Sequence, residues 1–152
     1  MIIRYAEEKD IPRLNYLFEL LIKYEGENYV DNIDKNVKIT SYFNRHLSCN
    51  DVVLVAVINN IIVGYIHSII DYDNKIKLKL EASINSLYVI KSYRNNKIGT
   101  KLVREMEQAL KLKNVKYISV SNIKSNNIAR TFYYKLGYNV INETRIKKIQ
   151  GW

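Results

Sequence analysis

The pattern of hydrophobic and polar residues changes its period several times along the chain. Near the N-terminus, residues 2–5 predict a short strand, and Asp10 and Pro12 are typical of a helix start, as N-cap and first-turn residue. Apolar residues then recur at helical spacing, at Ile11, Leu14, Leu17, Phe18, Leu21 and Ile22. This spacing predicts a helix that faces a core.

The middle of the chain predicts a second helix and then a hairpin. From about residue 34 to residue 47, one helix face carries Ile39, Tyr42, Phe43 and Leu47. Residues 52–58 and 61–70 are β-branched runs joined by Asn59-Asn60, a pair that tolerates positive φ, so they predict two antiparallel strands. Gly64 indicates a bulge or close packing in the second strand. The polar stretch 24–31 before the second helix is expected to border a substrate site.

The second half of the chain alternates strands and helices. Residues 76–89 predict a long strand, residues 115–120 another, and residues 138–150 a last strand region. The helix after Gly99 carries its apolar side at Leu102, Val103, Met106, Ala109 and Leu110. Ser125 is expected to cap a further helix that ends at Leu136, with Gly137 just beyond it. The order β-α-α-β-β-β-α-β-α-β, without a repeat or linker, predicts a single α/β (α+β) domain over residues 1–152.

Composition excludes several classes of protein. The chain has 152 residues, of which 47% are hydrophobic, so it can bury a core and is not a disordered chain. Apolar runs such as residues 52–58 are far too short to span a bilayer, and we expect no membrane as partner. The N-terminus leads directly into a strand and lacks the features of a signal peptide, which predicts a cytoplasmic location. The single cysteine, Cys49, has no second cysteine with which to form a disulfide or a zinc pair, so the sequence indicates no metal site.

The positive charge of the chain has two interpretations. A formal net charge of +9 and a pI near 9.5 are compatible with binding to nucleic acid. The basic residues are spread along the chain and interleaved with apolar ones, as at Lys75-Lys77-Lys79, which is typical of solvated faces. A small anionic ligand fits the charge equally well, and nucleic acid is the less expected partner.

The loop Tyr93-Arg94-Asn95-Asn96-Lys97-Ile98-Gly99-Thr100 is the first candidate for chemistry. It joins a predicted strand to an amphipathic helix, where several backbone N–H groups have no partner within the helix. Such groups bind phosphate, and Arg94 and Lys97 add positive charge at the same place. The loop is therefore predicted to be a phosphate cradle, with a solvated basic turn as the alternative.

A second motif follows about thirty residues later. The segment 126–138 contains Asn126, Ala129, Phe132, Tyr133, Leu136, Gly137 and Tyr138. Together with Arg94 and Gly99 of the loop, it resembles the GCN5-related N-acetyltransferase (GNAT) superfamily, whose cradle has Arg or Gln, then two variable residues, Gly, one variable residue, and Gly or Ala. The resemblance covers the whole domain and implies a mixed central sheet of six or seven strands, flanked by four helices and splayed between the central strand and the next. Lys97 departs from the pattern because the first glycine of the cradle is usual there.

The resemblance also implies acetyl-CoA as co-substrate. Its pyrophosphate would lie on the N–H groups of the cradle residues, which are Arg94, Asn95, Asn96, Lys97, Ile98, Gly99 and Thr100. Its pantetheine arm would pair with the central strand at Leu87, Tyr88 and Val89. Asn126 matches a position that often bonds to this arm, and it is equally a helix-start residue. Lys97 either contacts the pyrophosphate or points to solvent.

The reaction implied is attack of a neutral primary amine on the thioester of acetyl-CoA. A backbone N–H near Leu87 or Val89 would stabilise the oxyanion, and Tyr133 matches the tyrosine that protonates the leaving thiolate. The alternative for Tyr133 is a core aromatic. No general base is evident, because Ser83 and Asn85 cannot serve; Glu81, His67, a water chain and an amine of low pKa stay open.

The acceptor is not specified by the sequence and could be a small molecule or a peptide. Acidic residues between the first two helices could attract a cationic amine or only solvate the loop; they are Glu25, Glu27, Asp31 and Asp34. The segment after Tyr138 is short, and a homodimer that covers an exposed sheet edge stays open. Two other functions remain as alternatives, namely an acetyl-CoA-binding sensor without activity and a basic nucleic-acid-binding module.

Overall fold

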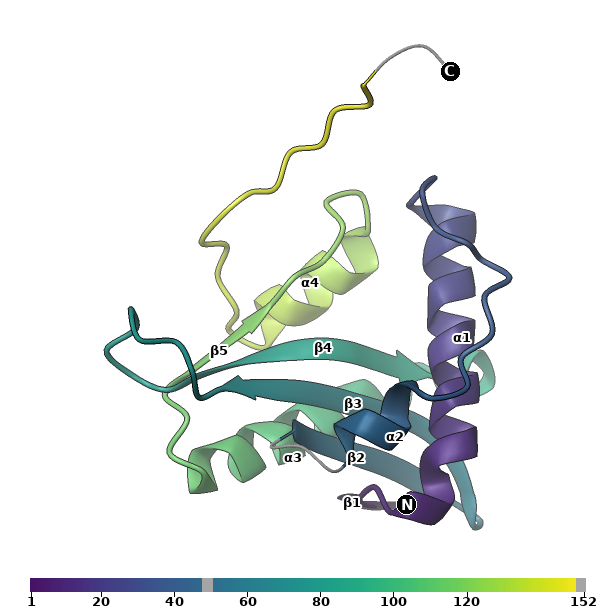
Figure 1. Cartoon of the computed structure of the whole chain (residues 1–152). Helices are drawn as coiled ribbons and strands as arrows, with labels where there is room; N and C mark the ends of the chain where they lie inside the picture. Colours follow the sequence, from purple (N-terminus) through teal and green to yellow (C-terminus); the bar gives the residue numbers. More distant parts are fainter. Residues whose placement is uncertain (48–50, 150–152) are drawn as a thin grey trace.

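The computed structural model describes residues 1–47 and 51–149, and its centre is a mixed five-stranded sheet. The strands lie in the order β1 (Ile2–Tyr5), β2 (Asp51–Ile58), β3 (Ile61–Asp71), β4 (Glu81–Val89) and β5 (Tyr117–Val120). Neighbours are antiparallel except β4 and β5, which are parallel. The α-helices are α1 (Ile11–Asn28), α2 (Tyr42–His46), α3 (Ile98–Leu112) and α4 (Asn127–Lys135), and short 3-10 turns occupy Glu8–Asp10 and Lys91–Tyr93 (Figure 1).

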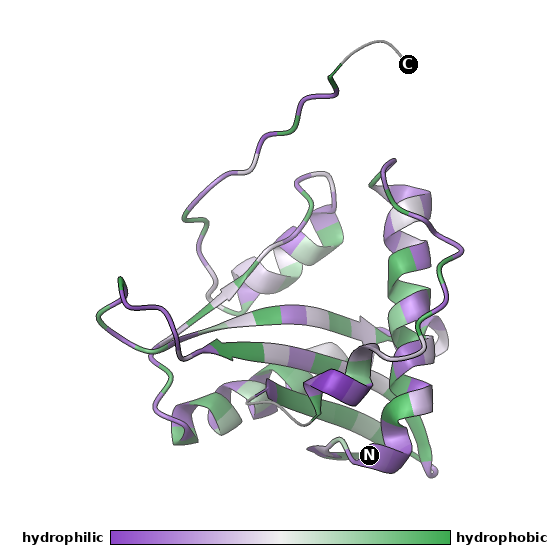
Figure 2. Ribbon diagram, viewed as in Figure 1, coloured by the Kyte–Doolittle hydropathy of each residue, from purple (hydrophilic) through white to green (hydrophobic). Residues whose placement is uncertain are grey.

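Each face of the sheet carries its own hydrophobic cluster. The α3 side buries Leu102, Val103, Met106 and Leu110 against apolar residues of β2, β3 and β4. The other side packs α1 and α2 against the same strands, through Leu14, Leu17, Phe43 and Tyr65. β2 and β3 are mainly hydrophobic in Figure 2, as expected of strands covered on both faces, whereas β4 alternates between hydrophobic and polar residues. The predicted apolar side of α3 is therefore confirmed.

The β2–β3 hairpin also agrees with the sequence. Asn59 and Asn60 have φ values of 49° and 62°, which is the positive-φ pair of a tight hairpin turn. At Gly64 an added Cβ would lie 2.9 Å from the backbone oxygen of Tyr88, and the β2–β3 register shifts between Ala56 and Val57 beside it. The absence of a side chain at Gly64 therefore allows β3 to pack closely against β4, and the β2–β3 pairing is irregular next to this residue.

The second helix is much shorter than the predicted segment 34–47. The side chain of Asp34 accepts the N–H of Asn36, and Glu19 of α1 accepts the N–H of Ile39 at 2.6 Å. Because these N–H groups bond to side chains, they are not available for helical bonds to carbonyls four residues back. The first helix, in turn, extends through residues 24–28, which the sequence assigned to a loop.

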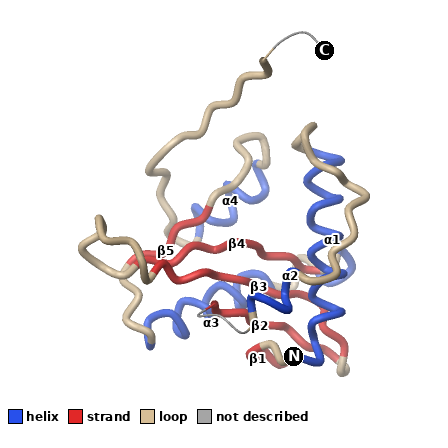
Figure 3. The backbone as a smooth tube through the Cα atoms, in the orientation of Figure 1, coloured by secondary structure: helices blue, strands red, loops and turns tan. Residues whose placement is uncertain are grey.

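The predicted strand over 76–89 is shorter than expected, and the predicted strand region 138–150 is absent over residues 138–149, while Gln150 lies outside the described residues. The side chain of Asn74 accepts the N–H groups of Ile76 and Lys77, and Leu78 is 98% exposed, so the segment before Glu81 forms no strand. Residues 138–149 have no regular secondary structure and extend away from the sheet, as the loop colour in Figure 3 shows. A strand is defined by its pairing with a neighbouring strand, and the described sheet contains only β1 to β5. The described sheet therefore has five strands instead of six or seven.

Asp10 precedes α1 as predicted but does not cap it. Its carboxylate bonds to both terminal nitrogens of Arg4, at 2.7 and 3.2 Å, and accepts the N–H of Glu7 at 2.8 Å. The ion pair fastens the end of β1 to the start of α1. Among the described residues, no helix is long and apolar enough to cross a membrane.

Candidate active site

The sheet opens between β4 and β5. The two strands pair only from Glu81 to Ile84 of β4, and β4 then continues without β5 to Val89. At the same place the β3–β4 register shifts, so Asn85 has no partner on β3 while its neighbours pair with Ser68 and His67. The extra residue bends β4 away from β5. The expected splay beside the central strand is present.

The backbone of β4 beyond this bulge faces the opening. The N–H of Ile90 donates to Val63 of β3 at 2.9 Å, and backbone groups of successive strand residues point to opposite sides. The N–H and C=O groups of Leu87 and Val89 therefore point away from β3, toward the side that β5 has left. The side chains of Leu87 and Val89 pack against the cluster on the α3 face. Among the described residues, the N–H groups of both residues and the C=O of Leu87 are free to pair with an extended ligand arm, whereas the C=O of Val89 accepts a hydrogen bond from Arg94.

The loop after β4 forms a cradle at the N-terminus of α3. Asn95 and Lys97 adopt positive φ values of 66° and 61°, and Lys97 occupies the N-cap position without a side-chain cap. The first helical hydrogen bond comes from Lys101, which donates to Lys97 at 3.0 Å. Within residues 1–47 and 51–149, the N–H groups of Ile98, Gly99 and Thr100 have no acceptor. They form a set of donors open to an anion.

The conformation of Lys97 explains the departure from glycine. The αL conformation that Lys97 adopts is the one that glycine adopts most easily, so lysine keeps the turn at a cost of about 1–2 kcal/mol. Its exposed ammonium lies at the positive end of the α3 dipole, and the first turn of α3 has no acidic residue. Positive charge at this end is unfavourable by itself and becomes favourable when an anion binds. The local electrostatics thus fit an anionic ligand.

Arg94 also has a structural role in this loop. Its Nε donates to the backbone oxygen of Val89 at 2.8 Å. Its guanidinium carbon lies 5.4 Å from the ring centre of Tyr24 and 5.2 Å from that of Tyr88. The side chain therefore joins the cradle to α1 and to the end of β4, and it positions the loop.

Asn126 begins α4, where the sequence expected Ser125. Its side-chain oxygen accepts the N–H of Ala129 at 3.1 Å, which is the bond of an N-cap. The helix ends before Gly137, whose φ is 93°, and Tyr138 donates to Tyr133 across this turn, as in a Schellman motif. The role of Asn126 as a helix-start residue is confirmed, and its amide nitrogen has no partner in the described part of the chain.

Tyr133 lies on the inner side of α4. It is half-buried, packs against the same cluster as Leu87 and Val89, and lies 5.0 Å from Phe132 and 5.6 Å from Tyr138 between ring centres. Burial raises the pKa of Tyr133 to about 12. Its hydroxyl has no hydrogen-bond partner among the described residues, whereas that of Tyr138 bonds to Glu107 at 3.0 Å. Tyr133 is therefore a protonated donor beside the opening.

The other face of β4 carries a polar cluster that the sequence analysis missed. Asn85 contacts the hydroxyl of Tyr42 at 2.5 Å and His67 at 3.5 Å. The opposite side of the His67 ring contacts Asp51 at 2.8 Å, and His46 contacts the same oxygen of Asp51 at 2.5 Å. Burial lowers the pKa of His67, against the opposing effect of Asp51. The donor atoms of His46, Asp51 and His67 lie within 4.8 Å of one another, so this group could hold a metal ion.

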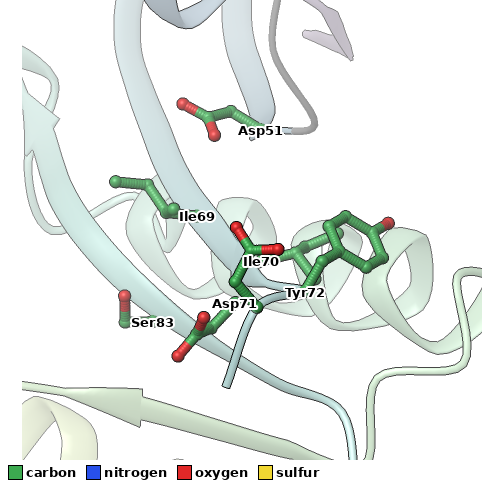
Figure 4. Close-up of a pocket in the computed structure, with 7 residues that line it drawn as sticks. Asp51, Ile69, Ile70, Asp71, Tyr72 and Ser83 are labelled. Atoms are coloured by element: carbon green, nitrogen blue, oxygen red, sulfur yellow. The ribbon is translucent and has the colours of Figure 1, made fainter. Parts of the chain in front are cut away.

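A pocket of about 520 Å³ opens beside this cluster. Its lining comes from β2, β3, β4 and the turn after β3, namely Asp51, Ile69, Ile70, Asp71, Tyr72, Asp73 and Ser83 (Figure 4). Asp51 belongs to both the pocket and the cluster. The sequence contains two histidines, His46 and His67, which was the only signal for this cluster. It did not show that the fold brings the carboxylate of Asp51 into contact with both rings.

The structure places two carboxylates that the sequence suggested, Glu81 as a candidate base and Glu25 as a candidate for amine binding, at different ends of the fold's elements. Glu81 lies at the start of β4, where β5 still pairs with it, and contacts Lys77 at 3.5 Å. It is thus four residues before the bulge, and it is not placed to act as a base at Leu87 or Val89. Glu25 of α1 is half-buried, has no ion pair among the described residues, and has its pKa raised by burial.

Comparison with known proteins agrees with this geometry. The model of the acetyltransferase (GNAT) family matches residues 3–138 of the chain. The chain belongs to the acetyltransferase (GNAT) family. Members of this family use acetyl-CoA, and family membership supports acyltransferase activity.

Three known proteins illustrate what the chain is similar to. An uncharacterised N-acetyltransferase of Methanocaldococcus jannaschii is 38% identical over 85 residues, which are 55% of this chain and 50% of that protein. The chain thus spans about half the length of this relative. The crystal structure of a mutant of the BH1408 protein from Bacillus halodurans has a TM-score of 0.87 at 21% identity, over 99% of this chain and 100% of that one. An aminoglycoside N-acetyltransferase in complex with CoA has a TM-score of 0.73 at 14% identity, over 99% and 100% of the two chains.

Proposed function

We propose that this GNAT protein transfers the acetyl group of acetyl-CoA to a primary amine of a small molecule or a peptide. The observation that carries this proposal is the uncapped N-terminus of α3 beside the opening between β4 and β5. It combines free N–H donors, the positive helix end and an exposed Lys97 at one place. The pyrophosphate of acetyl-CoA binds there, on the N–H groups of residues 95–100.

The pantetheine arm extends from the cradle along β4. It pairs with the free backbone groups of Leu87 and Val89, on either side of Tyr88, in the manner of an added strand, since β5 no longer occupies that side. The free amide nitrogen of Asn126 bonds to the arm from the α4 side, while its oxygen caps the helix. This position brings the thioester close to the bulge at Asn85.

The reaction is a direct attack of the amine nitrogen on the thioester carbonyl carbon. A backbone N–H of Leu87 or Val89 stabilises the tetrahedral oxyanion. When the intermediate collapses, the C–S bond breaks, and Tyr133 donates its phenolic proton to the departing sulfur. A phenol with a pKa of about 12 is protonated throughout the neutral range, which suits it to this step.

The acceptor approaches from the side of α1 and α2. Glu25 lies on α1 as a half-buried carboxylate without an ion pair among the described residues, so it can bind the cationic form of an amine. The aminoglycoside N-acetyltransferase named above shares the fold, and an aminoglycoside-like polyamine is the acceptor class we would test first. The cytoplasmic location and the homodimer stay predictions.

Two measurements test the proposal separately. Calorimetric titration with acetyl-CoA at low ionic strength should show binding with one site per chain, weakened by salt. A screen over aminoglycosides, polyamines and peptide N-termini should release free CoA thiol with at least one acceptor. Absence of binding would refute the whole assignment, whereas binding without thiol release from any amine would favour the sensor alternative.

A further inference from the structure

Both histidines of this chain contact a single carboxylate oxygen. His46 Nδ1 lies 2.5 Å and His67 Nε2 lies 2.8 Å from Oδ2 of Asp51. The three residues come from α2, β2 and β3, so the tertiary fold alone brings them together. Two imidazole nitrogens and a carboxylate oxygen that converge in this way form a typical ligand set for a transition-metal ion.

The burial of the group makes a positive ion favourable. The side chain of His67 is fully buried, that of Asp51 is 6% exposed, and that of His46 is 25% exposed. A carboxylate in such surroundings loses most of its hydration, which favours a positive charge beside it. A divalent cation between the three side chains would compensate the carboxylate directly.

The surroundings of His67 also fit a metal ligand. A histidine that binds a metal through Nε2 carries its proton on Nδ1 and donates it to an acceptor. Asn85 lies 3.5 Å from Nδ1 of His67 and 2.5 Å from the hydroxyl of Tyr42. The shorter distance is typical of an O–H···O bond, and the two ends of an amide differ only in their hydrogen bonds. The structure places the amide nitrogen of Asn85 at both groups. Rotation of the amide by 180° would bring its oxygen there instead, where it would accept from Tyr42 and from Nδ1 of His67 and leave Nε2 for a metal.

The donor types favour one class of ion. Mg²⁺ and Ca²⁺ prefer oxygen ligands, whereas Zn²⁺ accepts imidazole and carboxylate together. Bonds of about 2.0–2.2 Å would separate the ligand atoms by roughly 3.3 Å. The two contacts to Asp51 would lengthen by under about 1 Å, and the two imidazole nitrogens, which lie within 4.8 Å of each other, would adjust to the same separation. Asp51 lines the neighbouring pocket, which offers the ion a path from solvent.

We propose that His46, Asp51 and His67 bind a divalent transition-metal ion, with Zn²⁺ as the best-fitting ion. Three protein ligands leave one position of a tetrahedral site for water or another small ligand. The ion joins α2 to β2 and β3 beneath the bulge at Asn85. The site is independent of the acetyl-transfer proposal, because none of the three ligands takes part in the cradle.

The test is titration of Zn²⁺ into the full chain after treatment with a chelator and without an affinity tag. Calorimetry should show one Zn²⁺ per chain, and the melting temperature should rise with the zinc concentration. His46→Gln should abolish both effects, and so should Asp51→Asn. His46 is partly exposed, so its variant is expected to fold, and circular dichroism in the presence of chelator checks this for each variant.

Control variants define the ligand set. Asp71→Asn, on the opposite wall of the pocket, and Cys49→Ser should bind Zn²⁺ as the unmodified chain does. Asn85→Ala should weaken binding by about 10- to 100-fold through its effect on His67. No zinc binding by the unmodified chain would overturn the proposal. Equal binding by His46→Gln, or loss of binding in Cys49→Ser, would overturn it as well.

Discussion

The Nε of Arg94 donates to the backbone oxygen of Val89 across the turn that ends β4, at 2.8 Å. The two residues enclose the 3-10 turn Lys91–Tyr93, and the bond sets the direction in which the cradle leaves the strand. Arg94 thus acts on the cradle through its geometry.

Arg94→Ala should therefore weaken acetyl-CoA binding, because it removes the bond that orients the cradle. A hydrogen bond from a charged group is worth about 1.5–3 kcal/mol, and we expect roughly a tenfold loss of affinity by calorimetry. Arg104→Ala, which changes an exposed arginine of α3 paired with Glu107, provides the control. Equal affinities of Arg94→Ala and the unmodified chain would show that the loop holds its shape without this bond.

Two substitutions at Lys97 separate strain from charge. Lys97→Gly relieves the αL conformation, whereas Lys97→Ala keeps a Cβ in it, so the glycine variant should be more stable by about 1 kcal/mol in denaturant unfolding. Both variants lack the ammonium group and should bind acetyl-CoA more weakly and with a smaller dependence on salt. Undiminished binding by Lys97→Ala would indicate that the side chain points to solvent in the complex.

Tyr133→Phe should lower kcat by about 100-fold, while acetyl-CoA affinity stays nearly unchanged. Since the pKa of Tyr133 is raised to about 12, its phenol stays protonated up to about pH 11. The kcat profile should accordingly show no decrease due to this group between pH 7 and about pH 10. Tyr134→Phe is the matched control, because that neighbour is 74% exposed. Full activity of Tyr133→Phe in the thiol-release assay would refute the assigned role.

Hydrophobic periodicity and turn residues predicted those elements whose formation depends mainly on residues close in the sequence. The α3 helix and the Asn59-Asn60 hairpin follow from periodicity and turn chemistry, and both are present. The segments 34–41 and 76–80 failed because the side chains of Glu19, Asp34 and Asn74 bind their backbone N–H groups. Such competition is set by which groups meet in space, and periodicity does not record it.

The sequence predicted some parts of the candidate site and missed others. The cradle and Asn126 were identified because their residues lie together in the sequence at strand–helix junctions. Lys97 was identified as an exception, but only the structure gives its φ of 61°. The cluster of His46, Asp51 and His67 was missed, because its members come from three elements that only the folded sheet brings together.

The ion pair between Arg4 and Asp10 should give the protein an acid-dependent part of its stability. Burial opposes the charge of Asp10, but the hydrogen bonds from Arg4 and Glu7 outweigh this effect and hold the pKa of Asp10 below its ordinary value. A lowered pKa in the folded state means that the stabilisation is present above the ordinary value and is lost as the pH falls through the folded one. The free energy of unfolding should therefore decrease below about pH 4.

Asp10→Asn isolates this contribution. It should cost about 1.5–3 kcal/mol at pH 7, and the difference from the unmodified chain should shrink as the pH approaches the acid range. Asp73→Asn, in an exposed position after β3, should show no such difference. A difference for Asp10→Asn that stays constant between pH 3 and pH 7, measured by denaturant unfolding, would mean that packing and not charge connects β1 to α1.

Glu25→Gln tests whether the acceptor amine binds as a cation at the end of α1. Removal of the carboxylate charge should raise KM for a cationic amine by roughly tenfold and leave acetyl-CoA affinity unchanged, because Glu25 does not belong to the cradle. Burial raises the pKa of Glu25, so this carboxyl takes up its proton at a higher pH than an ordinary glutamate. KM for the amine should accordingly increase as the pH is lowered, and this increase should disappear in Glu25→Gln. Glu27→Gln changes an exposed glutamate of the same helix and should have no effect. If both variants keep the KM of the unmodified chain, the acidic residues of this region only solvate it, and the acceptor is recognised elsewhere.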